Sequence, residues 1–292
     1  MSLDHVRPVR GLPYHVCARG DSGVGAPDVV LLHGFTGSTR DWERTSDALG
    51  GAGLRAISID LPGHGATGAP DDRARYSMAE TAHDLCELLD GLRVRSAHWI
   101  GYSMGGRLAL YLAAMRPDRV ESLVLESASA GFEGGAARAT RRASDEALAD
   151  EIEGRGIEWF VDHWAAQPIF DSQRSLPPEA RFALRERRLR NDPAALAGSL
   201  RGLGQGAQPW MGGRLAAVRC PTLLITGTLD PKYTLLAGSM ATLLPHATHL
   251  AVPEAGHNVH LEQPEAYERA LLEHLRPFTR VSPLSAPSSL EA

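Results

Sequence analysis

A serine between two glycines is the first group in the sequence whose type and spacing could do chemistry. The segment Gly101-Tyr102-Ser103-Met104-Gly105 fits the pattern G-x-S-x-G. A strand-like run precedes it and a run rich in alanine and leucine follows it, which predicts a tight strand-to-helix turn that presents the serine hydroxyl. Glycines suit such a turn because they bring no side chains into it. Ser103 is therefore the candidate catalytic residue.

A catalytic serine needs a base, and the base needs an acid that orients it. Among the twelve histidines, His257 is the candidate because it directly follows a late strand-like run. Asp230 follows the preceding strand and is the expected acid, while Glu126, after an earlier strand, is the alternative acid. The order serine, aspartate, histidine along the chain is the order found around serines on turns of this kind.

Charge that develops on an oxygen during such a reaction needs backbone donors. The loop His33-Gly34-Phe35-Thr36-Gly37 follows the first buried strand. We expect the N–H of Phe35 to be one donor and that of Met104, the residue after Ser103, to be the other.

The elements that must position these residues alternate along the chain. Helical runs separate and follow the strand-like runs, which indicates a mostly parallel sheet flanked by helices, an α/β fold. The strand-like runs are 29–32, 54–60, 96–100, 120–125, 221–227 and 249–252, and the helical runs are 39–49, 78–92, 106–115 and 264–275. We expect a core of residues 1–130 and 209–278, a helical cap of residues 131–208 over the site, and a disordered tail at 279–292.

The composition excludes several classes of protein. The chain has 292 residues and a net charge of −5, which argues against a nucleic-acid-binding protein. No apolar run is long enough for a membrane helix and no secretory signal is visible, so we expect a cytoplasmic protein with no membrane insertion. Three widely spaced cysteines without a CxxC motif, and histidine pairs without nearby acids, predict neither a metal site nor a disulfide framework. No phosphate-loop or dinucleotide motif is present, and we expect no cofactor.

Six segments together carry a resemblance to a known family. Residues 10–278 resemble the α/β-hydrolase superfamily. Within it, the chain is similar to the 2-succinyl-6-hydroxy-2,4-cyclohexadiene-1-carboxylate (SHCHC) synthases of menaquinone biosynthesis. The segments are LLHGFTGS, DLPGHG, GYSMGGR, HWAAQPIF, GTLDPKY and AGHNVHLEQP.

This resemblance implies a lyase rather than a hydrolase. The family's substrate is 2-succinyl-5-enolpyruvyl-6-hydroxy-3-cyclohexene-1-carboxylate, a small tricarboxylate from which a ring proton is removed and pyruvate is eliminated. By motif position, the family's substrate-binding residues correspond to Tyr102, Arg107, Arg141, Trp164 and Arg190. Arg142 is an alternative to Arg141 because the two are adjacent.

Two other functions use the same residues or the same fold. A serine carboxylesterase or carbon–carbon bond hydrolase would share the triad, so only the arginines separate it from the lyase. A non-enzymatic receptor or scaffold would not need an intact serine, aspartate and histidine. The sequence does not determine the oligomeric state.

Overall fold

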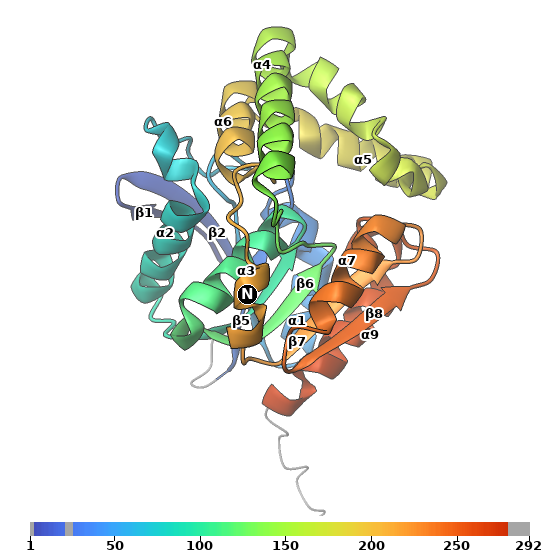
Figure 1. The fold of residues 1–292 in the computed structure, drawn as a ribbon. Coiled ribbons are helices and arrows are strands. Elements are labelled where there is room, and N and C mark those ends of the chain that lie inside the picture. Colours follow the sequence, from blue (N-terminus) through green and yellow to red (C-terminus); the bar gives the residue numbers. More distant parts are fainter. Residues whose placement is uncertain (1–2, 21–25, 280–292) are drawn as a thin grey trace, which may run out of the picture.

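A single sheet forms the centre of the molecule (Figure 1). The structure is a computed structural model that describes residues 3–20 and 26–279. Within this part of the chain the strand order is β1-β2-β4-β3-β5-β6-β7-β8. The strands are β1 (Leu3–Val9), β2 (Leu12–Gly20), β3 (Asp28–Leu32), β4 (Arg55–Ile59), β5 (Ala97–Tyr102), β6 (Val120–Glu126), β7 (Thr222–Gly227) and β8 (Ala247–Val252). β1 and β2 pair antiparallel with each other, and β2 pairs antiparallel with β4; the other pairs are parallel, which confirms the expected α/β class.

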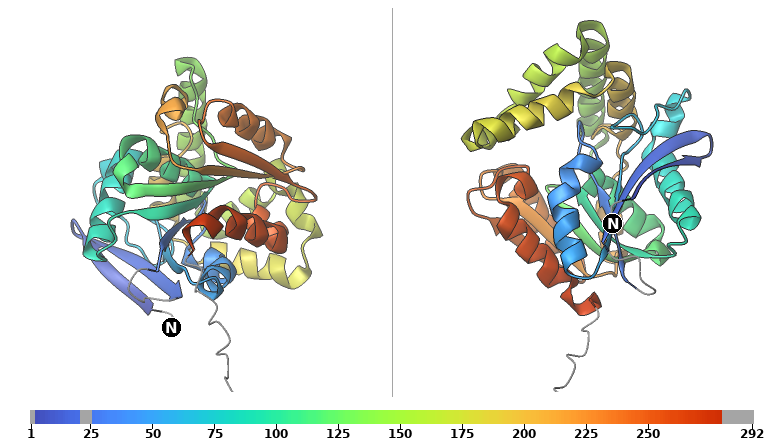
Figure 2. Two further views of the ribbon diagram at one scale, coloured as in Figure 1. Left: turned by 90° about the horizontal axis from the view of Figure 1, so that it is seen from below. Right: turned by 180° about the vertical axis from the view of Figure 1, so that it is seen from behind.

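Helices cover both faces of the sheet. α1 and α9 lie side by side on one face (Figure 2) and share an apolar core with it, while α2, α3 and α7 pack on the other face. Because both faces are covered, β5 and β7 are buried at every residue. The longer helices of these layers are α1 (Glu43–Gly51), α2 (Met78–Gly91), α3 (Met104–Met115), α7 (Pro231–Ala241) and α9 (Pro264–Leu275). The shorter ones are η1 (Thr39–Trp42), η2 (Arg73–Tyr76), η3 (Pro117–Arg119), η5 (Gly212–Ala217), α8 (Val259–Glu262) and η6 (Arg276–Phe278).

The chain between β6 and β7 is helical and lies above the sheet in Figure 1. We call residues 135–203 the cap; its helices are α4 (Gly135–Ala165), η4 (Pro168–Ser175), α5 (Pro178–Leu189) and α6 (Pro193–Leu203). Gly156 has a φ of 83° and interrupts α4, a backbone conformation that glycine adopts readily. Ile152, Phe160 and Leu196 are fully buried in a small core of the cap's own. Residues 131–208, which we expected to form a helical cap, therefore contain helices, and the structure describes no strand among them.

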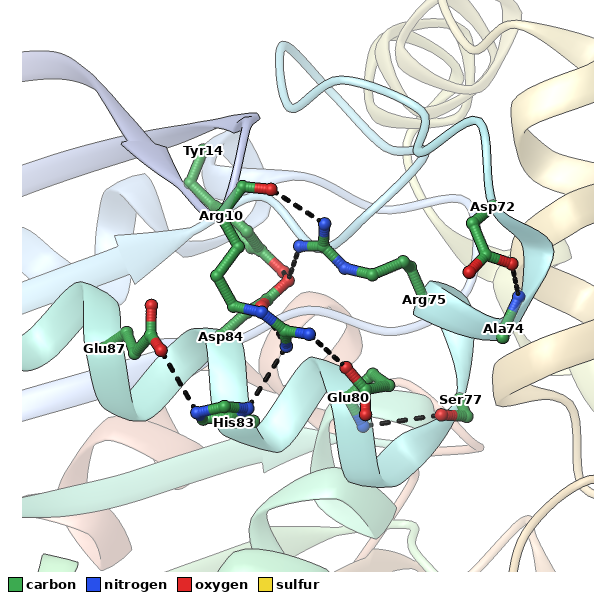
Figure 3. A network of polar contacts seen from close by, with 10 residues as sticks. All are labelled: Arg10, Tyr14, Asp72, Ala74, Arg75, Ser77, Glu80, His83, Asp84 and Glu87. Carbon is green, nitrogen blue, oxygen red and sulfur yellow. Dashed lines mark hydrogen bonds and ion pairs between the residues drawn. The ribbon is translucent and has the colours of Figure 1, made fainter.

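A buried carboxylate fastens the β1–β2 hairpin, which the strand pattern of the sequence did not predict. Asp84 on α2 accepts hydrogen bonds from Arg10 and Tyr14 of the hairpin, at 3.0 Å each, and from Arg75 of η2 at 2.7 Å (Figure 3). The Asp84 side chain is fully buried. Three elements are thus joined at one carboxyl group.

The sequence also led to expectations about the C-terminal tail, a membrane helix and a metal site. The tail expected at 279–292 lies outside the described residues except for Thr279. No helix in the described ranges is long and apolar enough to cross a membrane. Over the same ranges, no three histidine, cysteine, aspartate or glutamate side chains gather where they could hold a metal ion.

Candidate active site

Ser103 lies on a sharp turn between β5 and α3. β5 ends at Tyr102 and α3 begins at Met104, and Ser103 has a φ of 49°, which is unusual for a residue other than glycine. Its N–H donates to the carbonyl oxygen of Glu126 at 2.8 Å, and the N–H of Gly105 donates to that of His33 at 3.1 Å. A Cβ atom on Gly105 would overlap the backbone of β3, so the turn requires glycine there.

The structure brings Ser103, His257 and Asp230 together at the carboxyl ends of β5, β8 and β7. Ser103 Oγ lies 3.1 Å from His257 Nε2, and His257 Nδ1 lies 2.6 Å from Asp230 Oδ2. A neutral His257 that donates its Nδ1–H to the carboxylate leaves Nε2 free to accept the Ser103 proton. This arrangement can move a proton between Ser103 and His257.

Asp230 is held by the helix that follows it. It caps α7, where its Oδ1 accepts the N–H of Tyr233 at 3.2 Å while Oδ2 faces His257. The Tyr233 ring packs edge-on against the His257 ring, with centroids 4.5 Å apart. The capping bond and the ring contact fix the relative position of acid and base.

Glu126, the alternative acid, has a different partner. Its carboxylate accepts from the backbone N–H of His260 at 3.0 Å and lies 2.7 Å from His260 Nδ1. Glu126 is fully buried, and its carbonyl oxygen also holds Ser103 N–H. Between the two carboxylates, Asp230 is the one that contacts His257.

A cavity of about 420 Å³ opens above Ser103, between the sheet and the cap. Eight of the residues singled out from the sequence line it: Phe35, Tyr102, Ser103, Met104, Arg107, Arg141, Trp164 and His257. Asp230 lies behind His257 and does not line it. Phe35 lies in the loop after β3. Met104 is the first residue of α3, so its N–H has no partner within the helix. The two proposed backbone donors therefore come from neighbouring strand ends.

Two arginines of the cavity are oriented by glutamines from one loop. Arg107 is 5% exposed and donates to Gln208 Oε1 at 3.4 Å. Arg141 donates to Gln205 Oε1 at 2.9 Å and pairs with Asp145 at 2.7 Å. The adjacent Arg142 lines a different cavity, so Arg141 is the one that reaches this site.

Burial lowers the pKa of Arg107 to about 10, which leaves the guanidinium charged at neutral pH. No carboxylate lies within 4 Å of it in the described part of the chain. A buried cation without an anionic partner is unfavourable, so an anion that enters the cavity would gain a partner there.

Arg190 lies elsewhere, and the arginine of this segment that contacts a residue of the cavity is Arg188. Arg190 is exposed and lines a separate cavity with Arg187 and Asp60. Arg188 is 6% exposed, lies over the Phe170 ring at 5.2 Å, and has a pKa lowered by burial. The substrate-binding role expected of Arg190 therefore does not fit its position.

Aromatic side chains form the apolar wall of the cavity. Trp164 packs against Phe35 and Phe170, with ring centroids 5.4 Å and 5.6 Å apart. Phe170 also faces the His257 ring edge-on at 6.0 Å. Burial raises the pKa of the Tyr102 hydroxyl, which keeps it a hydrogen-bond donor at neutral pH. Sequence reasoning missed Phe170 and Lys232, which also line the cavity.

The fold and the site together define a class of enzyme folds. A mostly parallel sheet carries a serine on a strand-turn-helix, and an aspartate and a histidine follow the ends of later strands. The sequence profile of the alpha/beta hydrolase fold family matches residues 27–264. The chain therefore belongs to the alpha/beta hydrolase fold family.

Similarity to particular proteins narrows this class. The chain is 41% identical to a Bacillus subtilis (strain 168) protein assigned as a 2-succinyl-6-hydroxy-2,4-cyclohexadiene-1-carboxylate synthase, over 91% of this chain and 95% of that protein. The structure of MenH from S. aureus superposes with a TM-score of 0.87 at 32% identity, over 91% of this chain and 99% of that one. The structure of a thermophilic esterase from Thermogutta terrifontis superposes with a TM-score of 0.80 at 25% identity, over 96% of this chain and 100% of that one. Within the fold family, the chain belongs with the 2-succinyl-6-hydroxy-2,4-cyclohexadiene-1-carboxylate synthases.

Proposed function

We propose that this protein is a lyase of menaquinone biosynthesis that converts 2-succinyl-5-enolpyruvyl-6-hydroxy-3-cyclohexene-1-carboxylate into 2-succinyl-6-hydroxy-2,4-cyclohexadiene-1-carboxylate and pyruvate. The observation that carries the proposal is one cavity that combines the Ser103–His257–Asp230 chain with Arg107, a buried cation without a carboxylate partner. A neutral ester would not offset the free energy that this buried charge costs, whereas a tricarboxylate would.

The reaction is a proton abstraction coupled to loss of a leaving group. Ring carbon C2, which carries the succinyl ketone, loses its proton to the Ser103–His257 pair. The electron pair forms the C2–C3 double bond, the C3–C4 double bond moves to C4–C5, and the bond from C5 to the enolpyruvyl oxygen breaks. The leaving group is the enolate of pyruvate, which takes one proton on carbon. The balance closes without a further reactant.

Stabilisation of negative charge decides whether this chemistry is feasible. A proton beside a ketone is too weak an acid for an isolated serine, so the enolate oxygen must be held as it forms. The N–H groups of Phe35 and Met104 are the proposed donors. Loss of one such donor typically raises the barrier by about 3–4 kcal/mol.

The lyase and its hydrolase alternative predict different products. Purified protein is given the enolpyruvyl substrate, and pyruvate is followed with a coupled lactate dehydrogenase assay while the diene is followed by its absorbance. We expect the two products to appear at equal rates. Rapid hydrolysis of simple esters without pyruvate release would instead identify the protein as a serine hydrolase.

A further inference from the structure

The chain contains a single lysine, and that lysine lines the candidate active site. Of the 30 basic residues other than histidine, 29 are arginine and only Lys232 is lysine. Lys232 lies two residues after Asp230, in the first turn of α7, and shares the cavity with Ser103 and His257. In a chain that otherwise uses arginine at every basic position, a lone lysine at the site points to a requirement that arginine does not meet.

The charges around the cavity show which cations are available to a ligand. Arg141 is already paired with Asp145 at 2.7 Å. Lys232 and Arg107 have no carboxylate within 4 Å among the described residues. Arg107 is buried at the base of α3, whereas Lys232 is exposed to solvent. Among the described residues of the cavity, Arg107 is therefore a buried cation and Lys232 an exposed one, each without a carboxylate partner.

Lys232 is also close to the reacting groups. Its Nζ lies 5.5 Å from the centre of the Tyr233 ring, and that ring packs against His257 with centroids 4.5 Å apart. The Tyr233 ring therefore lies near both the ammonium group and the proposed base. Lys232 and His257 line the same cavity, so a ligand group beside His257 lies within reach of this ammonium group.

We propose that Lys232 binds the carboxylate of the enolpyruvyl group and holds that group as it leaves. This inference rests on the proposed function and assigns a subsite for a short α-keto acid within the same cavity. As the bond from C5 to oxygen breaks, the oxygen keeps the electron pair, and the lysine ammonium lies near both this enolate oxygen and the adjacent carboxylate. Lys232 keeps its proton throughout and acts by charge.

The chemistry of lysine suits this position better than that of arginine. An ammonium is a compact charge with three rotatable donors on a flexible stem, so it can follow a group that changes position. The rigid fork of arginine favours one planar, bidentate geometry and suits a carboxylate that stays bound, as at Arg107.

Inhibition by the two products tests whether Lys232 binds the pyruvate group specifically or attracts any anion by its charge. In Lys232→Met, we expect the inhibition constant of pyruvate to rise about tenfold or more, while that of the cyclohexadiene product changes less than twofold. The value of kcat/KM should fall by about ten- to a hundredfold, the typical effect of losing one charged hydrogen bond. Lys232→Arg should restore part of the pyruvate affinity. The control Arg269→Met removes an exposed charge of α9 and should change none of these values.

The single lysine allows a second test without mutation. Lys232 and the terminal amine are the amines that an acetylating ester can modify in the wild type. The same treatment of Lys232→Met controls for the terminal amine and for acetylated hydroxyls and thiols, Ser103 included. We expect acetylation of Lys232, mapped by mass spectrometry, to reproduce the change in pyruvate inhibition. If the wild type releases pyruvate, two results would overturn the inference. One is an equal change in the inhibition constants of both products, and the other is an unchanged inhibition constant for pyruvate. If the wild type releases no pyruvate, the proposed function itself fails.

Discussion

Ser103 has a backbone conformation that residues with side chains usually avoid. Its φ of 49° and ψ of −102° lie in a sparsely populated region, at a cost of roughly 1–3 kcal/mol. Two backbone hydrogen bonds hold the turn, from Ser103 to Glu126 and from Gly105 to His33. This backbone conformation places the hydroxyl at the end of the sheet, 3.1 Å from His257 Nε2. The turn thus fixes the hydroxyl before any substrate binds.

The first prediction concerns the role of this hydroxyl. Ser103→Ala should lower kcat by several orders of magnitude, because the members of a triad act as a unit. In the lyase mechanism no bond forms between Ser103 and the substrate. Mass spectrometry of the wild type during turnover should therefore detect only the unmodified chain. An adduct on Ser103 that forms and decays at the turnover rate would contradict the mechanism.

The second prediction compares the two buried carboxylates. Asp230→Asn should lower kcat by roughly 10⁴-fold without unfolding the protein. With Oδ1 held by the Tyr233 N–H, the amide NH2 replaces Oδ2 and presents a donor to His257 Nδ1 in place of an acceptor. Glu126→Gln should lower kcat far less, since Glu126 contacts His260. Rates are compared at equal concentrations of folded protein, measured by circular dichroism. A fully active Asp230→Asn beside an inactive Glu126→Gln would show that the acid is misassigned.

The third prediction compares three arginines. Arg107→Ala and Arg188→Ala should each lower kcat/KM for the tricarboxylate by about ten- to a hundredfold, the effect of a lost charged hydrogen bond. Lysine at these positions should restore only part of the activity. Arg190→Ala is the matched control and should stay within twofold, because Arg190 is exposed and lines a separate cavity, whereas Arg188 is buried over Phe170 of the site.

Hydrolysis of p-nitrophenyl acetate, where it occurs, provides the reference for these variants. It should barely change, because a neutral ester has no carboxylate for the arginines to bind. Equal losses on both substrates would mean that Arg107 and Arg188 support the fold rather than the ligand.

At the scale of secondary-structure elements, the Asp84 network links the hairpin to the cap. Asp84 joins β1–β2 to η2 through Arg75 (Figure 3). In η2, Tyr76 packs against α6, where a Cβ atom on Gly198 or Gly202 would collide with its side chain. The position of α6 in the cap therefore depends on contacts that begin at a buried carboxylate in the core.

The fourth prediction tests this network. Asp84→Asn should lower the free energy of unfolding by roughly 3 kcal/mol, because it leaves Arg10 and Arg75 without their buried charge partner. Urea denaturation measures the change. The control is Glu87→Gln, which removes an exposed carboxylate that pairs with His83 at 3.1 Å and should change stability by less than about 1 kcal/mol. Equal effects of the two substitutions would exclude Asp84 as a structural centre.

The elements also show what the sequence could predict. Strands buried on both faces, such as β5 and β7, give continuous apolar runs, and glycine or proline marks their ends, so the core was predictable. The hairpin was not, because Pro8 and Pro13 interrupt it and it has no such apolar run. α7 was missed because only its Tyr233, Ala237 and Met240 are buried, which gives a weak helical pattern.

Some residues of the candidate site were also predictable from the sequence, and others were not. Ser103, Asp230 and His257 were predictable because Ser103 directly follows β5, and Asp230 and His257 lie in the short loops after β7 and β8. The choice between Arg188 and Arg190 was not, because it depends on how α5 is rotated above the sheet, and no motif in the cap fixes that rotation. Lys232 is conspicuous in the sequence as the single lysine, but its approach to the cavity was not predictable, because it depends on the direction in which α7 leaves Asp230.

At the scale of the whole molecule, two apolar layers on opposite faces of the sheet enclose several ionisable groups. His64 is 1% exposed and packs against His33 and Phe35, with ring centroids 5.0 Å and 5.7 Å away. Burial lowers the pKa of His64 to about 3, from an ordinary value of 6.5. The folded protein therefore keeps this histidine neutral where the unfolded chain would protonate it.

The fifth prediction is a loss of stability in acid. Between pH 3 and 6.5 the unfolded state binds more protons at His64 than the folded state does, so its contribution is complete above pH 6.5 and is lost as the pH falls. At pH 5 the loss from this group should be about 2 kcal/mol relative to pH 7.5. Urea denaturation of wild type and His64→Gln at both pH values measures it. The variant should show the smaller difference, and identical differences would contradict the assignment.

Phe35 belongs to both halves of the molecule at once. Its ring touches Phe160 and Trp164 of the cap and His64 of the core, while its backbone N–H is a proposed donor to the reacting oxygen. An evolutionary consequence follows. A cap exchanged for one from another member of the fold family would give this ring new neighbours and shift the loop that carries the donor. Substrate range and catalytic rate would then change together, so recombination of caps in this lineage is constrained by the chemistry of the core.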